Sequence, residues 1–326
     1  KFEAPVYPGD TIAVKVKVAK KNEPLRALSL SVEVTKESDA GKKAASGLAE
    51  VALSGPPAAG SVAAVGSAVL SVPAFRQSMP AGAVALVTGG SRGIGAAAAE
   101  ALARRGLRVV VQYRADDAAA EKTMAGLRSF GASAAACKAD LASSEGARQA
   151  FDAAVREYGR VDVLVNNAGP AVVRRDILEL APGELKSCFD VYVSSAFDLV
   201  RLAAPGMRER GFGRVINILS SVVLGAPPQG WTAYATAKHA LWGLTRSLAL
   251  ELGPWGITCN AVSPSLVPTD QWSGLSENQL RAMALRNPTR RLAGVRDVAE
   301  TVAFLAGPEA QHINGANIPV TGGETL

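Results

Sequence analysis

The stretch AVALVTGGSRGIGAAAAEAL, residues 83–102, decides the fold of this chain. Its first part, residues 84–87, is a short apolar run, which is typical of a buried strand. A turn with the spacing Gly89-x-x-x-Gly93-x-Gly95 follows, and then an alanine-rich segment that favours a helix. In this order, the free N–H groups of a helix N-terminus and the small glycines suit the close approach of a dinucleotide phosphate. Because an ordinary tight turn gives the same glycines, this interpretation needs support from other residues.

The composition favours packed cores and about two domains. The chain has 326 residues, 48% of them hydrophobic, and a net charge of +6 from scattered arginine and lysine. This charge favours anionic ligands, and nothing in its pattern supports nucleic-acid binding. No signal peptide heads the chain, and no apolar run reaches the roughly 20 residues that a membrane span needs.

Cysteine and histidine are too few and too scattered for a disulfide framework or a metal site. Cys137, Cys188 and Cys259 lie far apart in the sequence, and the chain has two histidines. We therefore predict free thiols, no bound metal and a reducing, cytoplasmic location. The chain begins at Lys1 without a methionine, which we interpret as the sign of a partial or trimmed sequence.

The first part of the chain has a different pattern from the rest. Residues 11–19 and 26–34 alternate strictly between apolar and polar side chains, and residues 47–53 repeat this more weakly. Three half-buried antiparallel strands are predicted in a small β segment over residues 1–55. Residues 56–80 are rich in proline, alanine, glycine and serine, which predicts a linker.

From residue 81 onward, predicted strands and helices alternate to the end of the chain. This rhythm predicts an α/β fold of Rossmann type, with a doubly wound parallel sheet and helices on both faces. Ligands of such sheets bind at the carboxyl ends of the strands. The strands are expected at residues 84–87, 108–113, 161–165, 214–219 and 257–262, with another ending near 138–140, and helices at 118–130 and 143–158.

A second pattern, Tyr234-Ala-Thr-Ala-Lys238, places a phenol and an ammonium one helical turn apart on the same face. A nearby cation favours the phenolate, so we expect Lys238 to lower the pKa of Tyr234 towards a useful range for acid/base catalysis. Ser221 stands at a spacing of thirteen residues before the tyrosine, just after a predicted strand. An exposed helix face would explain Tyr234 and Lys238 alone. Together with the glycine turn and Asn166-Asn-Ala-Gly169, in this order, they predict an active site.

These motifs resemble those of the short-chain dehydrogenase/reductase family, over residues 83–326, and most closely its 3-oxoacyl-thioester reductases. The resemblance implies hydride transfer from a nicotinamide cofactor, with Tyr234 as the acid, Lys238 on the cofactor ribose and Ser221 orienting the substrate. It also implies a homo-oligomer, either a dimer or a tetramer. The cofactor contacts that follow from the turn and the resemblance are Gly89, Ser91, Arg92, Gly93, Ile94, Gly95, Arg114, Asp140, Leu141, Asn167, Ala168, Gly169, Tyr234, Lys238, Pro264 and Thr269. Among them, the resemblance places Asp140 by the adenine, Asn167 by the ribose, and Pro264 and Thr269 by the nicotinamide.

The cofactor can also be argued from charge. Sheets that bind NAD place a carboxylate after the second strand, whereas an arginine there accommodates the 2′-phosphate of NADP. Here that strand is followed by Arg114, and Arg92 lies in the glycine turn. Asp116 and Asp117 come two and three residues later. We predict NADPH, although both arginines would also be ordinary as solvated surface charges.

The sequence departs from the family pattern at two positions. Tyr192 stands where the family has an asparagine that helps to organise a water near the lysine, which puts the proton relay in doubt. Ser265 follows Pro264 where a glycine is usual. Neither change removes the serine, tyrosine or lysine, so an active, slower enzyme is favoured over an inactive one.

The substrate is weakly encoded. Residues 270–291 are expected to form a lid, with a capping box at Ser276 and Gln279. Leu280, Met283 and Leu285 form an apolar stripe there, which suits either packing or an acyl chain.

Residues 2–12 resemble the closing half of the hot-dog fold of MaoC-like hydratases. The catalytic Asp/His pair of that family lies upstream of this half, and both His239 and His312 fall in the predicted reductase domain. We therefore expect residues 1–55 to have a structural role.

Because ketoreduction and dehydration are consecutive steps on one acyl chain, the MaoC-like segment favours reduction of a 3-oxoacyl thioester on a carrier protein or CoA. Two alternatives stay open. One is a reductase of a free ketone, sugar or alcohol, and the other is a catalytically impaired nucleotide-binding subunit of a larger synthase.

Overall fold

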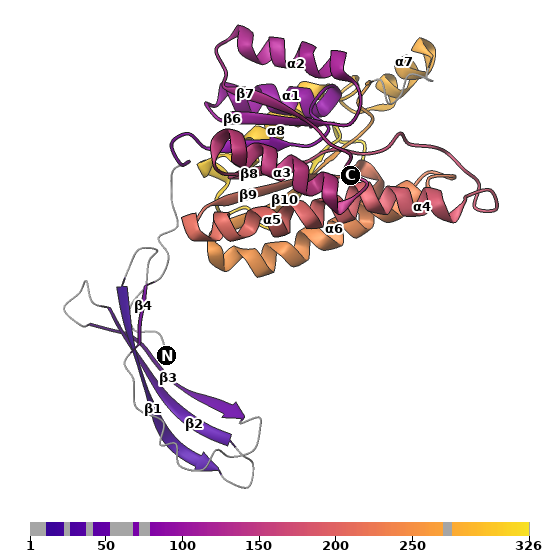
Figure 1. Ribbon diagram of the computed structural model, residues 1–326. Helices are drawn as coiled ribbons and strands as arrows, with labels where there is room; N and C mark the ends of the chain where they lie inside the picture. The colour runs from indigo at the N-terminus through magenta and orange to yellow at the C-terminus, as the bar shows by residue number, and fades with distance from the viewer. Residues whose placement is uncertain are drawn as a thin grey trace. The chain divides into compact units, whose positions relative to one another are not determined.

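The computed structural model describes residues 11–22, 27–36, 42–52, 68–71, 79–269 and 276–325. The chain divides into two compact units, Lys1–Phe75 and Arg76–Leu326. Figure 1 shows a sheet in the first unit and a sheet flanked by helices in the second. Each unit is described by itself.

The first unit contains an antiparallel four-stranded sheet in the order β3-β2-β1-β4. The register pairs Val16 with Val32 and Val32 with Gly47, and paired positions share one face of a sheet. The three predicted strands are present and longer than expected, and residues 68–71 of the predicted linker add a fourth, because they pair with the start of β1. The strands are β1 (Thr11–Asn22), β2 (Ala27–Lys36), β3 (Lys42–Ala52) and β4 (Ala68–Ser71).

The second unit is built on a seven-stranded parallel sheet in the order β11-β10-β9-β8-β5-β6-β7. The strand order reverses between β5 and β8, which is where doubly wound sheets bind ligands. The Rossmann-type α/β fold predicted from the sequence is confirmed. The strands are β5 (Val84–Val87), β6 (Arg108–Tyr113), β7 (Ala134–Lys138), β8 (Val163–Asn166), β9 (Gly213–Ile218), β10 (Ile257–Pro264) and β11 (Asn317–Val320).

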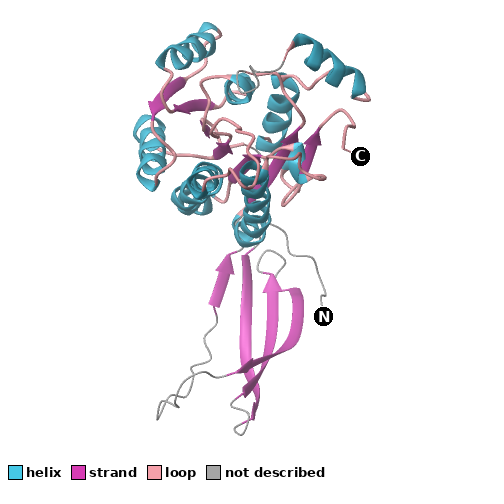
Figure 2. Cartoon of the chain, turned by 90° about the vertical axis from the view of Figure 1, so that its right-hand side faces the viewer, coloured by secondary structure: helices cyan, strands magenta, loops and turns pink. Residues whose placement is uncertain are grey.

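Helices cover both faces of this sheet, as Figures 1 and 2 show. One core joins α1, α2 and α8 to the sheet, and the other joins α3, α5 and α6 to its opposite face. Successive residues of β5 alternate between them, with Ala85 and Val87 in the first core and Val84 and Leu86 in the second. The helices are α1 (Gly93–Arg104), α2 (Asp117–Ser129), α3 (Ser144–Tyr158), α4 (Pro182–Phe189), α5 (Ser195–Arg210), α6 (Thr232–Leu252), α7 (Glu277–Arg286) and α8 (Val295–Ala306).

Short helical turns complete the second unit. A π-helical turn, η2 (Asp190–Ser194), lies between α4 and α5, and a 3-10 turn, η3 (Ser221–Val223), follows β9. Two further 3-10 turns are η4 (Gly253–Trp255) and η6 (Pro308–Ala310).

The described part of the predicted lid contains one helix, α7. Its capping box is confirmed, because Gln279 N donates to Ser276 Oγ at 3.3 Å and Ser276 N donates to Gln279 Oε1 at 2.8 Å. The apolar stripe does not pack into the core: Met283 is 36% and Leu285 63% exposed. Residues 270–275, with which the predicted lid begins, lie outside the described residues.

Candidate active site

The glycine turn between β5 and α1 is packed so closely that side chains are excluded. Gly89 and Gly93 have φ angles of +60° and +56°, in the left-handed region that favours glycine. A Cβ at Gly95 would overlap the carbonyl oxygen of Gly89, and one at Gly89 would lie 2.9 Å from Ala168 Cα. The predicted residues Gly89, Gly95 and Ala168 therefore meet at one point.

The loop after β8 holds this turn in place. Asn167 Nδ2 donates to Thr88 O at 2.9 Å and to Gly89 O at 3.1 Å. Thr88 Oγ1 accepts the backbone N–H groups of Asn167 and Ala168 at 2.9 and 3.0 Å. The Asn167 amide, expected at the cofactor ribose, donates to two carbonyl oxygens of the turn in the structure and so fixes its shape.

The N-terminus of α1 is open to an anion. Its N-cap, Arg92, makes no side-chain capping hydrogen bond, and no acidic residue stands in the first turn. Thr269, from the segment after β10, lies beside Gly93, since a Cβ built there would be 3.3 Å from Thr269 Cγ2. An uncapped helix N-terminus at a glycine cradle fits the phosphates of a dinucleotide.

Carboxylates near the end of β6 are already engaged. Asp117 pairs with Lys138 at 2.8 Å and accepts the Tyr113 hydroxyl at 2.9 Å. Asp116 caps α2 by accepting Ala119 N at 2.9 Å and lies 3.6 Å from Arg92. Since both aspartates have partners, they are poor candidates for a ribose diol.

Gln112, at the end of β6, connects three parts of this edge and was not predicted. Its side chain accepts Gly89 N at 2.8 Å and donates to Ala139 O at 2.7 Å. In the sequence, the available signal was a glutamine within an otherwise apolar predicted strand. Beyond it, Leu141 is buried, and Asp140 is exposed with Oδ1 accepting Ala142 N at 3.0 Å.

The remaining predicted contacts of the turn lie around α1. Ser91 O accepts the Thr123 hydroxyl at 2.8 Å, and Ile94 packs against the core shared with α8. Arg114 is exposed just after β6.

Lys238 is buried on α6, with 3% of its surface exposed. Its ammonium donates to Ile218 O at 2.7 Å and lies 3.9 Å from the centroid of the Tyr192 ring. The ring centroid of Tyr234 is 5.7 Å away from the same nitrogen. Burial lowers the pKa of Lys238 to about 7, because the charged form loses its water.

Tyr234 differs from expectation in the direction of its pKa. Burial raises the pKa of Tyr234 to about 12, while a hydrogen bond with Ser220 lowers it. The expected lowering by Lys238 is not what the structure shows: loss of water outweighs the other effects, and the ammonium is directed at Ile218 O and Tyr192. A phenol of this kind is protonated at neutral pH, the form that donates a proton.

Two serines follow β9, and they have different surroundings. Ser220 Oγ accepts Val222 N at 3.3 Å and also interacts with Tyr234. Ser221, the predicted residue, opens η3 half-buried, and within the described part of the chain its hydroxyl has no hydrogen-bond partner. The sequence spacing identified Ser221 and missed Ser220.

A buried polar chain anchors α6 to the sheet. Asn166 Nδ2 donates to Asn217 Oδ1, and Asn217 Nδ2 donates to Thr245 Oγ1, each at 2.8 Å. These three side chains come from β8, β9 and α6, so they fix the height of Tyr234 and Lys238 above the sheet edge.

The end of β10 reaches the same edge. Pro264 is its last residue, and Ser265 N donates to Val320 O at 3.1 Å. The Ser265 hydroxyl is buried and has no hydrogen-bond partner among the described residues. An orphaned hydroxyl beside Pro264 suits a polar ligand group at this point.

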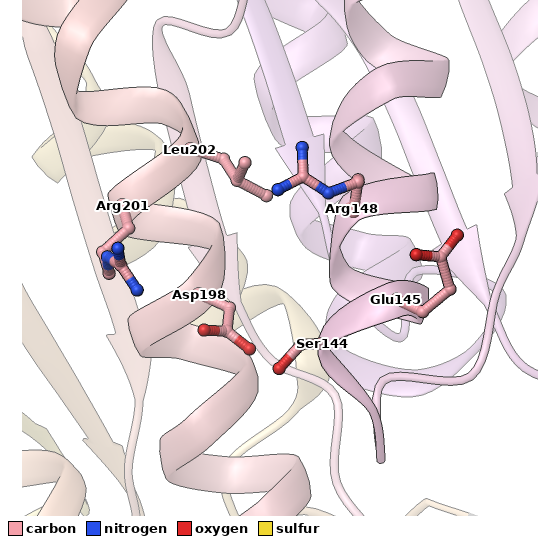
Figure 3. Close-up of a pocket in the computed structure, with 6 residues that line it drawn as sticks. All are labelled: Ser144, Glu145, Arg148, Asp198, Arg201 and Leu202. Atoms are coloured by element: carbon pink, nitrogen blue, oxygen red, sulfur yellow. The ribbon is translucent and has the colours of Figure 1, made fainter.

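The second unit also contains a cavity and three cysteines. A cavity of about 320 Å³ between α3 and α5 is lined by charges of both signs, and Figure 3 shows them: Ser144, Glu145, Arg148, Asp198, Arg201 and Leu202. Within the described ranges, no cluster of metal-ligating side chains occurs, and no helix is long and apolar enough to cross a membrane. Cys137, Cys188 and Cys259 are unpaired.

Comparison with known proteins identifies relatives of this chain. A family model described as enoyl-(acyl carrier protein) reductase matches residues 89–325. The short-chain reductase protein NovJ of Streptomyces niveus is 38% identical over 249 residues, which cover 74% of this chain and 93% of that protein. The 3-oxoacyl-(acyl-carrier-protein) reductase FabG of Staphylococcus aureus is 36% identical over 241 residues, covering 73% of this chain and 96% of its own length.

A solved structure agrees with these relatives. A variant of actinorhodin polyketide ketoreductase with NADPH superposes with a TM-score of 0.69 and 34% identity, covering 74% of this chain and 97% of the other. The order of strands, the glycine turn and the tyrosine–lysine helix are thus accounted for together, and the chain belongs to the short-chain dehydrogenase/reductase family of oxidoreductases.

Proposed function

We propose that this chain reduces the 3-oxo group of an acyl thioester, carried by a carrier protein or CoA, to the 3-hydroxyacyl thioester with NADPH. The observation that carries the proposal is the buried, protonated Tyr234 on α6, in contact with the η3 turn where Ser221 has no hydrogen-bond partner among the described residues, at the sheet edge that also holds the glycine turn. A proton donor and a second hydroxyl are what the oxygen of a ketone needs as it becomes an alcohol.

NADPH is favoured over NADH by the charges around the adenosine end. Arg92 and Arg114 would meet the 2′-phosphate, since Asp117 is paired with Lys138 and Asp116 caps α2 beside Arg92. The open N-terminus of α1 would receive the pyrophosphate. The residues that we propose to hold the cofactor are Gly89, Ser91, Arg92, Gly93, Ile94, Gly95, Arg114, Asp140, Leu141, Asn167, Ala168, Gly169, Tyr234, Lys238, Pro264 and Thr269.

When bound, NADPH supplies the hydride that reduces the carbonyl carbon. Tyr234 donates its hydroxyl proton to the carbonyl oxygen, which leaves a phenolate. The Ser221 hydroxyl orients that oxygen, and the Ser220 hydroxyl lowers the pKa of Tyr234, so it stabilises the phenolate. The Lys238 ammonium would bind the ribose.

An acyl substrate is supported by the relatives and by α7. FabG is named for 3-oxoacyl groups on acyl carrier protein, and the family model is described in terms of the same carrier. The exposed Met283 and Leu285 offer an apolar surface that suits an acyl chain. We also propose a homo-oligomer, because the chain belongs to the same family as these relatives.

The test is oxidation of NADPH by the full chain with acetoacetyl-CoA and acetoacetyl-pantetheine, against simple ketones and sugars at equal concentration. We expect kcat/KM for the thioesters to exceed that for the free ketones and sugars. Equal or higher kcat/KM with a ketone or a sugar would mean that the substrate is of that class and not a thioester. If none of the compounds is reduced while NADPH still binds, the chain would instead be a nucleotide-binding subunit. Tyr234→Phe is the control for non-enzymatic oxidation.

A further inference from the structure

The inference concerns Tyr192, which the reaction described above does not use. Tyr192 lies in η2, the π-helical turn between α4 and α5, and only 4% of its surface is exposed. Single π-helical turns inside α-helices are frequently found at functional sites, because the extra residue redirects a side chain. Here the redirected side chain is an aromatic ring.

The ring of Tyr192 touches both proposed catalytic groups of α6. Its centroid is 3.9 Å from Lys238 Nζ, well within the range of a cation–π interaction. It meets the ring of Tyr234 edge-on, with centroids 5.7 Å apart and an angle of 74° between the planes. The tyrosine is therefore in contact with the proton donor and with the cation beside it.

Two further contacts fix the ring in this position. The Tyr192 hydroxyl donates to Pro170 O at 3.3 Å. On the side of the cofactor loop, a Cβ at Gly169 would overlap ring atoms of Tyr192. Position 169 thus leaves room for the ring because it is glycine.

The buried ammonium needs this ring. An ammonium has three donors, and within the described residues Lys238 has one hydrogen bond, to Ile218 O, and no ion pair. The groups that face it are Tyr234 on α6, Tyr192 on η2 and the Cys188 thiol on α4. Since the thiol is neutral at ordinary pH, the face of the Tyr192 ring is, beside Ile218 O, the second electrostatic partner of the charge.

We propose that Tyr192 is a positioning residue, whose ring face holds the Lys238 ammonium and whose edge-to-face contact orients Tyr234. The inference rests on the roles proposed above for Lys238 and Tyr234. It also gives the departure from the family pattern a physical meaning, because an aromatic face replaces an amide at this place. Tyr192 acts through its neighbours, so its loss is expected to change kcat more than KM.

Two substitutions separate the ring from the hydroxyl. Tyr192→Phe keeps the π face and removes the bond to Pro170 O, whereas Tyr192→Leu keeps an apolar side chain and removes the π face. We expect Tyr192→Leu to lower kcat about tenfold and Tyr192→Phe to keep most of the native kcat. Tyr158 is the matched control, since Arg108 lies 5.7 Å over its ring away from the active site. Tyr158→Leu is expected to leave kcat unchanged.

A second readout needs no substrate. The pKa of Lys238 is measured by NMR titration of lysine-labelled chains, with Lys238→Met identifying the signal. We expect Tyr192→Leu to lower this pKa by about one unit, because the buried ammonium keeps Ile218 O and loses the aromatic face, and Tyr192→Phe to leave it near the native value.

The outcomes separate this inference from the proposed function. If the chain reduces no thioester but the pKa of Lys238 falls only in Tyr192→Leu, the substrate proposal fails and the positioning role stands. If the pKa does not fall in Tyr192→Leu, or falls equally in Tyr192→Phe, the positioning role is wrong whatever the substrate.

Discussion

The glycine turn and the Tyr234 cluster, meaning Tyr192, Tyr234, Lys238 and the two serines after β9, share the carboxyl edge of one sheet, yet they are built differently. The turn is made of backbone: Gly89, Gly95 and Ala168 approach so closely that no larger side chain fits. The cluster is made of side chains, with a buried ammonium between a carbonyl oxygen and an aromatic ring.

In the proposed function, this difference separates two tasks, cofactor binding and proton transfer. The turn presents N–H groups to an anion and depends on shape, so changes there should alter cofactor affinity. The cluster controls the positions of protons and depends on burial, so changes there should alter turnover. Substitutions that affect one task and spare the other sharpen this comparison, and substitutions that affect both break it.

The largest effect is expected for Tyr234→Phe, which keeps the ring and removes the proton donor. The kcat should fall by about 10²–10⁴-fold, the usual contribution of a general acid. The affinity for NADPH, measured by fluorescence titration, should stay close to native. A variant that keeps most of its activity would mean that another group is the acid.

Lys238→Met tests the cost of burying the charge. Because the pKa of Lys238 is about 7 in the folded chain and 10.5 as the ordinary value, the folded state is penalised fully below pH 7, and the penalty disappears as the pH rises towards 10.5. We expect the inactive variant to melt at a higher temperature than the native chain at about pH 6, with the gain shrinking above neutral pH. A gain that is independent of pH would show that Lys238 is not buried as a charge.

The two serines provide an internal comparison. Ser221→Ala removes the unpartnered hydroxyl and should lower kcat by about 10²-fold, as the loss of one donor to a developing oxyanion does. Ser220→Ala should have a smaller effect on kcat and should move the basic limb of its pH profile upward, because the bond that lowers the pKa of Tyr234 is lost. The reverse order of the two losses would assign the substrate oxygen to Ser220.

The parts of this sheet edge that could be predicted are those formed by residues close together in the sequence. The glycine turn, the strands of the parallel sheet and the Tyr234/Lys238 pair are each contained in a few consecutive residues, and the structure has them where expected. The contacts of Gln112, Ser220 and Tyr192 depend on how β6, η3 and η2 meet α6 and the turn. No spacing in the sequence predicts these tertiary contacts.

The pKa of Tyr234 was missed for a related reason. The sequence shows that a cation is one helical turn away, but it does not show that the cation is buried too and faces another ring. The strand β4 is a comparable case, because its four residues pair with β1 from within a proline-rich stretch. In both cases a tertiary contact decides the outcome.

On the side of the turn, Arg114→Asp should affect cofactor choice and spare the cluster. We expect the native chain to prefer NADPH over NADH by at least about tenfold, or roughly 1.4 kcal/mol, and the variant to lose much of this preference. The measurement is kcat/KM for both cofactors. Equal use of NADH and NADPH by the native chain would refute the assignment.

The smallest effect on reduction is expected from removal of residues 1–80. We propose that residues 1–55 form a structural segment, residues 56–80 a linker around β4, and residues 81–326 the reductase domain. The truncated chain should keep the kcat of the full chain while its solubility or assembly changes. Hydration of crotonyl-CoA by the full chain, lost on truncation, would show instead that the first unit is an enzyme.

Transfer of deuterium tests the central claim most directly. The full chain is incubated with acetoacetyl-CoA and NADPH that carries deuterium on the transferable position of the nicotinamide ring, and the product is analysed by mass spectrometry and NMR. The account predicts a 3-hydroxybutyryl thioester with deuterium on the carbon that bears the hydroxyl, and no such product from Tyr234→Phe. A product without deuterium at that carbon, or an undiminished yield from Tyr234→Phe, would contradict it.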